Sequence, residues 1–364
     1  MRRIRVTIDA VPLLLRSAGV KTYLYYWIHS LVRHAGADAV RLFPFLDPAV
    51  ECVHESSPLG RMATLARLSL LHLANGCPVP LLNPLGARSD IFHASHQLVR
   101  PPSNTCVTAT LYDMTCWLVP EMHSPANVRA AKKFARRVLG RASGIIAISE
   151  ATRRDALRIL GLREERVKVI YPGVADGFFR AKPSPCAKPY VLFVGTIEPR
   201  KNLGVLLDAY QDLPADLRNA YDLVVAGSPG WGEPGVLMRL RSGFPGVRYL
   251  GYVPEDRLPS LTAGATAFVY PSLYEGFGLP VAQAMAAGVP VITSNVSSLP
   301  EVAGDAALLV DPRSTADVRA ALARLLTSPD LRIRLGAAGK LRAPQYSWDR
   351  AARCTWEFFE QVST

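Results

Sequence analysis

The chain has 364 residues, more than one hydrophobic core usually supports, so two domains are expected. Its 49% hydrophobic and 20% charged residues are typical of a folded globular protein and exclude disordered and fibrous classes. The formal net charge of +12 favours anionic partners, which include nucleotide phosphates, acidic lipids and nucleic acid, without choosing among them.

Membrane, export and disulfide signals are missing from the sequence. No segment approaches the ~20 consecutive apolar residues of a membrane-spanning helix. Asp9 and Arg16 interrupt the first apolar stretch, and no small-residue cleavage site follows it. The cysteines have no C-x-x-C spacing, which indicates neither a zinc site nor a disulfide framework and fits a cytoplasmic protein; they are Cys52, Cys77, Cys106, Cys116, Cys186 and Cys354.

Short apolar segments alternate with longer helical patterns through both halves of the chain. This alternation predicts an α/β fold with two similar, doubly wound parallel sheets. The strands predicted in the first half are residues 5–10, 39–43, 90–94, 105–111, 144–149 and 167–171. Those predicted in the second half are residues 190–194, 222–226, 247–250, 265–270, 290–293 and 307–310.

Residues 179–189 contain three prolines and several cations, a composition that predicts a linker. The predicted domains are therefore residues 1–178 and 190–345. Ligands of open parallel sheets bind beyond the carboxyl ends of the strands, so a ligand cleft is expected where both sets of strand ends meet. The tail, residues 346–364, has the apolar spacing of a helix.

Three features of the first half are candidates for function. Gly19 begins a helical pattern and would let the backbone approach a ligand, although a simple turn explains it equally well. His93 and His96 are three apart on a strand end, which is poor spacing for a metal pair. At least one is expected to line the cleft, and an ordinary surface position is the alternative. Residues 127–141 form a basic amphipathic helix that suits docking on anionic lipid or, alternatively, an ordinary surface position with one buried stripe.

The second half contains two candidate anion-binding corners. After the strand at residues 190–194, Arg200 and Lys201 stand at a helix start, where cations oppose the helix dipole unless a negative ligand compensates them. The alternative is an exposed basic pair. After the strand at residues 265–270 come Glu275, a glycine turn and a helix with Pro280 in its first turn. Such a corner favours an anionic ligand, and a solvated glutamate is the alternative.

Residues 271–290 resemble the signature of glycosyltransferase family 4. In that signature a glutamate, a GFGLP turn and a second glutamate hold a nucleotide sugar. Glu275 is the first glutamate, and Gln283 stands where the second is expected, so donor binding should survive in weakened form, since an amide accepts only through its oxygen. The resemblance assigns the donor-binding turn to Gly276, Phe277, Gly278 and Leu279.

The segment after residues 190–194 resembles the phosphate-holding element of the same family. Its usual form is glycine, arginine, four variable residues and lysine. Gly195 and Lys201 match, Thr196 replaces the arginine, and Arg200 is the substitute cation. Residues 251–258 resemble the segment that frames the nucleotide base, which implies contacts from Tyr252 and Val253.

In the first half the resemblance is looser. Gly19 matches the glycine loop that approaches the diphosphate. Tyr112 and Asp113 stand where the family has His-Asp, and the histidine contacts the donor sugar in relatives. Tyrosine still donates a hydrogen bond, and no imidazole base is needed if the leaving phosphate takes the acceptor's proton, as proposed for retaining enzymes of this family. The family's tail crosses back onto the first domain.

The resemblance implies a GT-B fold and a retaining transferase that moves a hexose, with mannose preferred, in surface polysaccharide assembly. A GDP-sugar is the preferred donor, a UDP-sugar is close behind, and the acceptor is a saccharide or lipid-linked oligosaccharide. Glu275, Arg200, Lys201, Asp113 and Tyr112 would carry the transfer, with no metal or other cofactor. An anionic membrane surface is a further partner, which implies a peripheral position on the inner face of the membrane.

Two other functions remain open at this stage. The changes at Tyr112 and Gln283 fit a catalytically weak subunit that binds sugar nucleotides within a glycosylation complex. Nucleic-acid binding agrees with the net charge alone, because the sequence has no recognition motif or aromatic platform for it.

Overall fold

The chain folds into two compact units in the computed structural model, which describes residues 4–15, 19–49, 56–77, 79 and 81–363. Unit 1 consists of Met1–Gly173 and Ser347–Thr364, and unit 2 consists of Val174–Tyr346. Residues 179–189, predicted as a linker, therefore fall within unit 2, where the Ser184 amide donates to the Ser260 carbonyl at 3.2 Å. Arg16 and Cys52 lie outside the described residues.

The sheet of unit 1 has six parallel strands in the order β2-β1-β3-β4-β5-β6. Their bounds are β1 (Val6–Asp9), β2 (Val40–Phe43), β3 (Ile91–Ala94), β4 (Cys106–Leu111), β5 (Gly144–Ala147) and β6 (Val167–Val169). Every residue of β1, β3 and β5 is buried. Continuous burial is typical of parallel strands covered on both faces, and it explains their unbroken apolar sequences.

The sheet of unit 2 also has six parallel strands, in the order β12-β11-β10-β7-β8-β9. Their bounds are β7 (Tyr190–Val194), β8 (Asp222–Ala226), β9 (Val247–Gly251), β10 (Ala267–Tyr270), β11 (Val291–Ser294) and β12 (Ala307–Val310). All the predicted strands are present with bounds within two residues of the expected ones, so the predicted fold class is confirmed.

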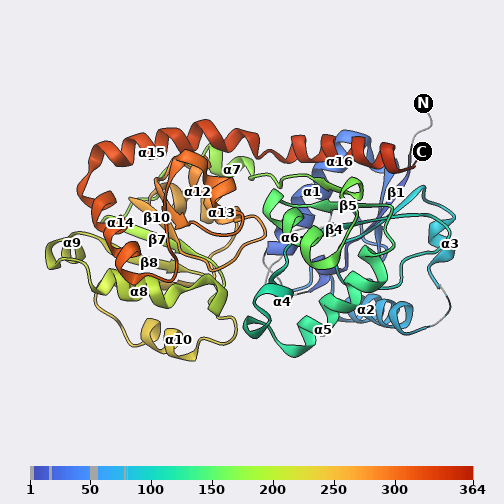
Figure 1. Cartoon of the computed structure of the whole chain (residues 1–364), viewed down its shortest axis with the longest axis horizontal. Coiled ribbons are helices and arrows are strands. Elements are labelled where there is room, and N and C mark those ends of the chain that lie inside the picture. Colours follow the sequence, from blue (N-terminus) through green and yellow to red (C-terminus); the bar gives the residue numbers. More distant parts are fainter. Residues whose placement is uncertain (1–3, 16–18, 50–55, 78, 80, 364) are drawn as a thin grey trace. The chain divides into compact units, whose positions relative to one another are not determined.

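Helices connect and cover the strands of each unit (Figure 1). In unit 1 they are α1 (Gly19–Ala35), α2 (Arg61–Gly76), α3 (Asn83–Gly86), α4 (Thr115–Leu118), α5 (Pro125–Phe134), α6 (Glu150–Leu160) and α16 (Trp348–Ser363). In unit 2 they are α7 (Asp176–Phe179), α8 (Leu203–Gln211), α9 (Ala215–Ala220), α10 (Pro234–Arg241), α11 (Leu258–Ala263), α12 (Leu279–Ala286), α13 (Leu299–Ala303), α14 (Thr315–Thr327) and α15 (Pro329–Arg342). No helix in the described part of the chain combines the length and apolarity needed to cross a membrane.

Helix α16 completes unit 1 although it is the last element of the chain. It packs beside α1, drawn in blue at the other end of the colour scale (Figure 1). The indole nitrogen of Trp27 on α1 donates to the Thr355 hydroxyl on α16 at 3.0 Å, and both residues are buried. Phe358 lies so close to Gly144 of β5 that a Cβ at this glycine would overlap its ring.

We predict that Gly144→Ala destabilises unit 1 by about 1–3 kcal/mol, because the added methyl group must push α16 away from β5. Chemical unfolding measures the change. Gly140→Ala is the matched control, since a Cβ there would lie 3.4 Å from the Arg136 carbonyl oxygen without overlapping it. Equal stability of the two variants would contradict the close packing of α16 on β5.

Candidate active site

The sheet of unit 2 reverses its strand order between β7 and β10. The chain proceeds from β7 to β8 on one side and from β10 to β11 on the other, so the connections diverge at this point. Ligands of open parallel sheets bind at such a switch point, beyond the carboxyl ends of the strands. The two predicted anion-binding corners follow β7 and β10 and therefore meet there.

Backbone geometry shapes the loop after β7. Its first residue, Gly195, lies against Gly227 of the neighbouring loop, which has φ +153 and whose Cβ would overlap the Gly195 carbonyl group. One turn of 3-10 helix, Pro199–Lys201, follows and ends at Asn202, which has a left-handed φ of 57. The Asn202 amide donates to the carbonyls of Pro271 at 3.0 Å and Pro312 at 2.6 Å. These bonds hold the loop after β7 against the loops after β10 and β12.

Arg200 and Lys201 both form ion pairs with Glu275. An Arg200 guanidinium nitrogen lies 2.8 Å from Glu275 Oε2, and Lys201 Nζ lies 2.6 Å from Oε1. Arg200 also lies 2.6 Å from the carboxylate of Glu198 and donates to the Tyr274 carbonyl at 2.7 Å. The side chains of Arg200, Lys201, Glu198 and Glu275, which we call the ion-pair cluster, are all 15% exposed or less.

Hydroxyl groups hold Glu275 in place. Its Oε1 accepts hydrogen bonds from Tyr270 at 3.0 Å and from Ser272 at 2.7 Å. Its amide donates to the Ser297 hydroxyl at 3.0 Å, and Ser298 donates to its carbonyl at 2.9 Å. The carboxylate is therefore fixed by two hydroxyls at the end of β10 and by two cations, and the hydroxyls beyond β11 hold the Glu275 backbone.

The charges within the cluster control protonation. Burial by itself would raise the pKa of Glu275, but the charges of Arg200 and Lys201 outweigh it and lower this pKa to about 2. Burial, together with the positive charge of Arg200, lowers the pKa of Lys201 from its usual value. Glu275 is therefore a carboxylate at neutral pH, able to accept hydrogen bonds from sugar hydroxyls.

The turn after Glu275 begins α12. Gly278 has φ +98, which favours glycine, and its Cβ would meet Leu299 at 2.6 Å. Gly276 and Phe277 are buried, and Leu279 is the first residue of α12, with Pro280 in the first turn as predicted. Gln283 lies one turn further along α12 and is 8% exposed. The turn therefore points the amino-terminal end of α12 towards the carboxyl ends of the strands, as the sequence predicts.

The remaining predicted donor contacts in unit 2 lie near these strand ends. Gly195 and Thr196 directly follow β7 and are half-buried. Tyr252 and Val253 follow β9, two strands from β7, with Tyr252 41% exposed. Their proposed contact with a nucleotide base stays a prediction.

Unit 1 has its own reversal of strand order, between β1 and β3, and a buried polar group lies there. Asp9 ends β1 and accepts from the amides of Val11 and Leu98, both at 3.2 Å, while burial raises its pKa. His93 on β3 is fully buried between the hydroxyls of Thr108 and Thr110, and burial lowers its pKa to about 3. Of the two histidines singled out by the sequence, only His96 reaches solvent.

Tyr112 and Asp113 follow β4, next to that point. The Tyr112 hydroxyl is buried without a hydrogen-bond partner among the described residues, and its ring packs edge-on against Tyr23 of α1 at 5.2 Å. Asp113 accepts from the amide and the hydroxyl of Thr115 at 3.0 and 2.6 Å, which fixes the start of α4. Gly19 is the exposed first residue of α1, and apart from its chain neighbours and its own helix backbone no atom of the described residues lies within 4 Å of a Cβ built on it.

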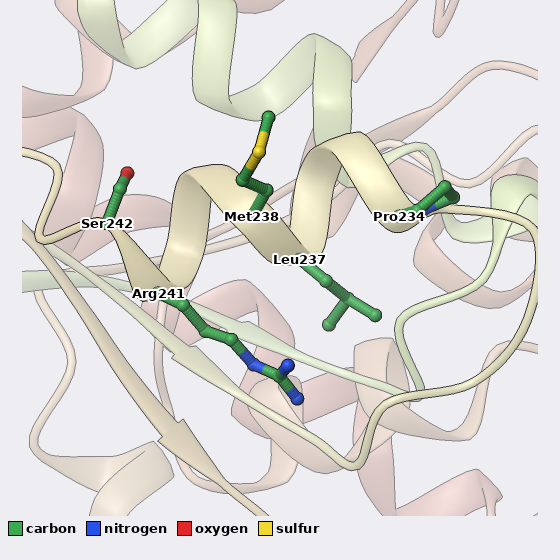
Figure 2. A pocket seen from close by; sticks show the side chains of 5 residues that line it. All are labelled: Pro234, Leu237, Met238, Arg241 and Ser242. Atoms are coloured by element: carbon green, nitrogen blue, oxygen red, sulfur yellow. The ribbon is translucent and has the colours of Figure 1, made fainter.

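No cluster of metal-ligating side chains competes with this site in the described structure. No group of three or more His, Cys, Asp or Glu side chains within residues 4–15, 19–49, 56–77, 79 and 81–363 is placed to hold a metal ion. An open hollow lies along α10. Figure 2 shows that Met238 points to the opposite side of α10 from Leu237 and Arg241. The side chains that line this hollow therefore do not converge on a ligand.

The sequence interpretation missed several polar residues near the strand ends. Tyr270 and Ser272 were read only as parts of a strand and its loop, although polar residues at the end of a buried strand are a usable signal. Glu198 was overlooked because its contact with Arg200, two residues away, depends on the 3-10 turn between them. Asp9 was considered only as an interruption of an apolar stretch.

Comparison with known proteins matches both units to glycosyltransferase families. Residues 176–342 match the family Glycosyl transferases group 1, and residues 18–177 match Glycosyltransferase Family 4. O-antigen chain mannosyltransferase B of Escherichia coli is 37% identical over 279 residues, which cover 72% of this chain and 71% of that protein. Serotype-specific mannosyltransferase WbdA of Escherichia coli is 30% identical over 237 residues, 61% of this chain and 29% of that longer protein.

Among solved structures, HepE from Anabaena in complex with UDP and glucose matches with a TM-score of 0.71. Its sequence identity is 20%, and the match covers 98% of this chain and 99% of that one, so the likeness shows the fold. The two doubly wound sheets, matched over nearly the whole chain by this structure, show that the chain has the GT-B fold. The chain belongs to glycosyltransferase family 4, and it is an enzyme of that family.

The lowered pKa of Glu275 predicts a specific pH dependence of stability. Its folded value of about 2 lies below the ordinary value of 4.5, so its ionisation stabilises the folded protein above the ordinary value. This contribution is lost as the pH falls from about 5 to about 2. We expect the difference in free energy of unfolding between the natural protein and Glu275→Gln to shrink by about 2 kcal/mol between about pH 6 and about pH 3.

Urea unfolding at several pH values measures this difference. Glu165→Gln is the control, because Glu165 is 68% exposed in its pair with Arg163, and its effect should hardly vary with pH. A constant difference for Glu275→Gln would show that the two cations do not lower the pKa of this carboxylate.

Proposed function

We propose that this glycosyltransferase is a retaining enzyme that moves a hexose, preferably mannose, from a nucleotide-diphosphate sugar to a saccharide or lipid-linked acceptor in surface polysaccharide assembly. The ion-pair cluster at the switch point of unit 2 is the observation that carries the proposal. The choice of mannose and of polysaccharide assembly is supported by the 37% identity to an O-antigen mannosyltransferase.

Departure of the diphosphate is the step that the cluster would assist. Two cations in a largely water-excluded site stabilise the negative charge that develops on the leaving phosphate, and such electrostatic terms are usually the largest in catalysis. Arg200 offers a planar fork to the phosphate oxygens and Lys201 a point charge. The leaving phosphate would take the proton of the acceptor hydroxyl, so no protein base is required.

Glu275 would position the sugar. Its Oε1 accepts hydrogen bonds from the hydroxyl groups of Tyr270 and Ser272, and a sugar would add or replace such donors. The fixed orientation of the carboxylate limits the reorganisation needed on binding. The pKa of about 2 keeps this acceptor ionised at neutral pH.

A GDP-sugar is the preferred donor, with a UDP-sugar as the alternative. A UDP complex is known for HepE, whose similarity supports the fold alone. Gln283 would contact the ribose through its amide oxygen, and Tyr252 and Val253 would frame the base. Tyr112 and Asp113 would shape the acceptor side of unit 1, Asp113 by fixing the start of α4.

A panel of GDP- and UDP-sugars tests the proposal by slow donor hydrolysis and by thermal stabilisation of the protein. We expect one donor to be hydrolysed. Lys201→Ala should lower that turnover by about 100-fold or more, because a buried phosphate-neutralising charge is lost. Lys182→Ala, which removes an exposed lysine of the same unit, should leave turnover unchanged.

The outcomes separate the candidate functions. Stabilisation by a donor without turnover, even when acceptor saccharides are added, would favour a catalytically weak subunit, which the changes at Tyr112 and Gln283 also fit. No response to any nucleotide sugar would overturn the proposed donor class.

The basic surface of α5 and the turn after it would place the enzyme at the cytoplasmic face of a membrane. The apolar stripe of this segment is buried, including Ala131, Phe134 and Val138, so lipid contact would be electrostatic. The exposed cations that would make this electrostatic contact are Arg129, Lys132, Arg136 and Arg141. Each is worth about 1 kcal/mol near an anionic surface.

We predict that the triple variant Arg129→Gln, Lys132→Gln, Arg136→Gln binds vesicles rich in anionic lipid about 100-fold more weakly. Co-sedimentation with vesicles measures the change. The matched control is Arg319→Gln, Arg324→Gln, Arg334→Gln, which removes the same charge from exposed positions of α14 and α15. Equal weakening by both variants would mean that net charge, and not α5, drives any lipid binding.

A further inference from the structure

Glu198 is a buried carboxylate to which the proposed transfer assigns no role. It is 5% exposed and directly precedes the 3-10 turn Pro199–Lys201, yet its side chain does not cap that turn. One of its oxygens, Oε1, lies 2.6 Å from an Arg200 guanidinium nitrogen. A carboxylate hidden from water is costly unless it is paired, so this contact fixes both partners.

The charges of the ion-pair cluster cancel one another. Arg200 and Lys201 contribute two positive charges, and Glu198 and Glu275 contribute two negative ones. A nucleotide diphosphate would therefore arrive at a neutral cluster with two carboxylates already on its cations. Glu275 has a use for its charge in holding the sugar, whereas Glu198 occupies an Arg200 guanidinium nitrogen that would otherwise donate to a phosphate oxygen.

We propose that Glu198 is a positioning residue that competes with the diphosphate for Arg200. Before the diphosphate binds, Glu198 holds the Arg200 guanidinium in place. A phosphate group then displaces the Glu198 carboxylate from Arg200. Its negative charge thereby weakens the binding of both the donor and the nucleoside diphosphate product, which promotes product release. The inference rests on the proposed function and adds to it a residue that sets the affinity for diphosphate.

The test compares Glu198→Gln with the natural protein in calorimetric binding of GDP, UDP and the corresponding nucleosides. The glutamine keeps an oxygen that accepts from Arg200, removes the charge and replaces the other oxygen with an NH2 group. We expect the variant to bind the nucleoside diphosphate about tenfold more tightly, because a like charge near the phosphates is gone. Nucleoside binding should stay the same, and the donor KM should fall together with kcat if product release limits turnover.

Asp212→Asn is the matched control for charge. Asp212 is exposed and directly follows α8, so the length of that helix separates it from Lys201 by about 14 Å, and the same change of charge there should leave diphosphate binding unaltered. If Glu198→Gln does not fold, Glu198→Ala removes the charge as well and should tighten binding in the same direction.

Two failures are distinguishable. If the natural protein binds neither nucleoside diphosphate, the proposed function falls and this inference falls with it. If the natural protein binds one of them but the variant binds it equally or more weakly, only the inference is overturned, and Glu198 then serves to orient Arg200 for the phosphate without competing with it.

Discussion

The pairing of Lys201 with Glu275 is the interaction on which the site depends. Neither charge could remain buried alone, because an unpaired ion in a water-poor interior costs several kcal/mol. Each is supplied by a different loop, one after β7 and one after β10, and the Asn202 amide joins those loops independently of the charges. The site is thus pre-organised by backbone contacts, and its electrostatics are set by only four side chains.

Strand order explains why these loops meet. β7 and β10 are neighbours in the sheet although most of the unit's first half separates them in sequence, and the connections leave them in opposite directions. The space beyond their carboxyl ends is consequently free of crossing chain. Gly195 and Gly227 allow the loops after β7 and β8 to approach more closely than side chains would permit.

Much of this could be predicted from the sequence, because each part is local. Buried parallel strands are continuous apolar runs, and the corner at Glu275 is a strand, a glycine turn and a proline-started helix in immediate succession. The features that the sequence did not predict depend on contacts between residues far apart in the chain. The Tyr112 hydroxyl is buried where the Tyr112 ring packs against Tyr23 of α1. The first unit ends at Gly173, before the proline-rich residues 179–189 that were predicted as the linker. Composition indicates where a chain lacks regular structure, not which unit it packs on.

The position of α16 also determines the order in which the two units can be finished during synthesis. Unit 2 is built from residues 174–346 alone, whereas β5 of unit 1 is covered by Phe358, which is synthesised after all of unit 2. Domains usually complete in the order in which they leave the ribosome. Here the second unit can close first, while the first retains an uncovered apolar face until residues 347–363 emerge, which makes unit 1 the part of the nascent chain that a chaperone would need to protect.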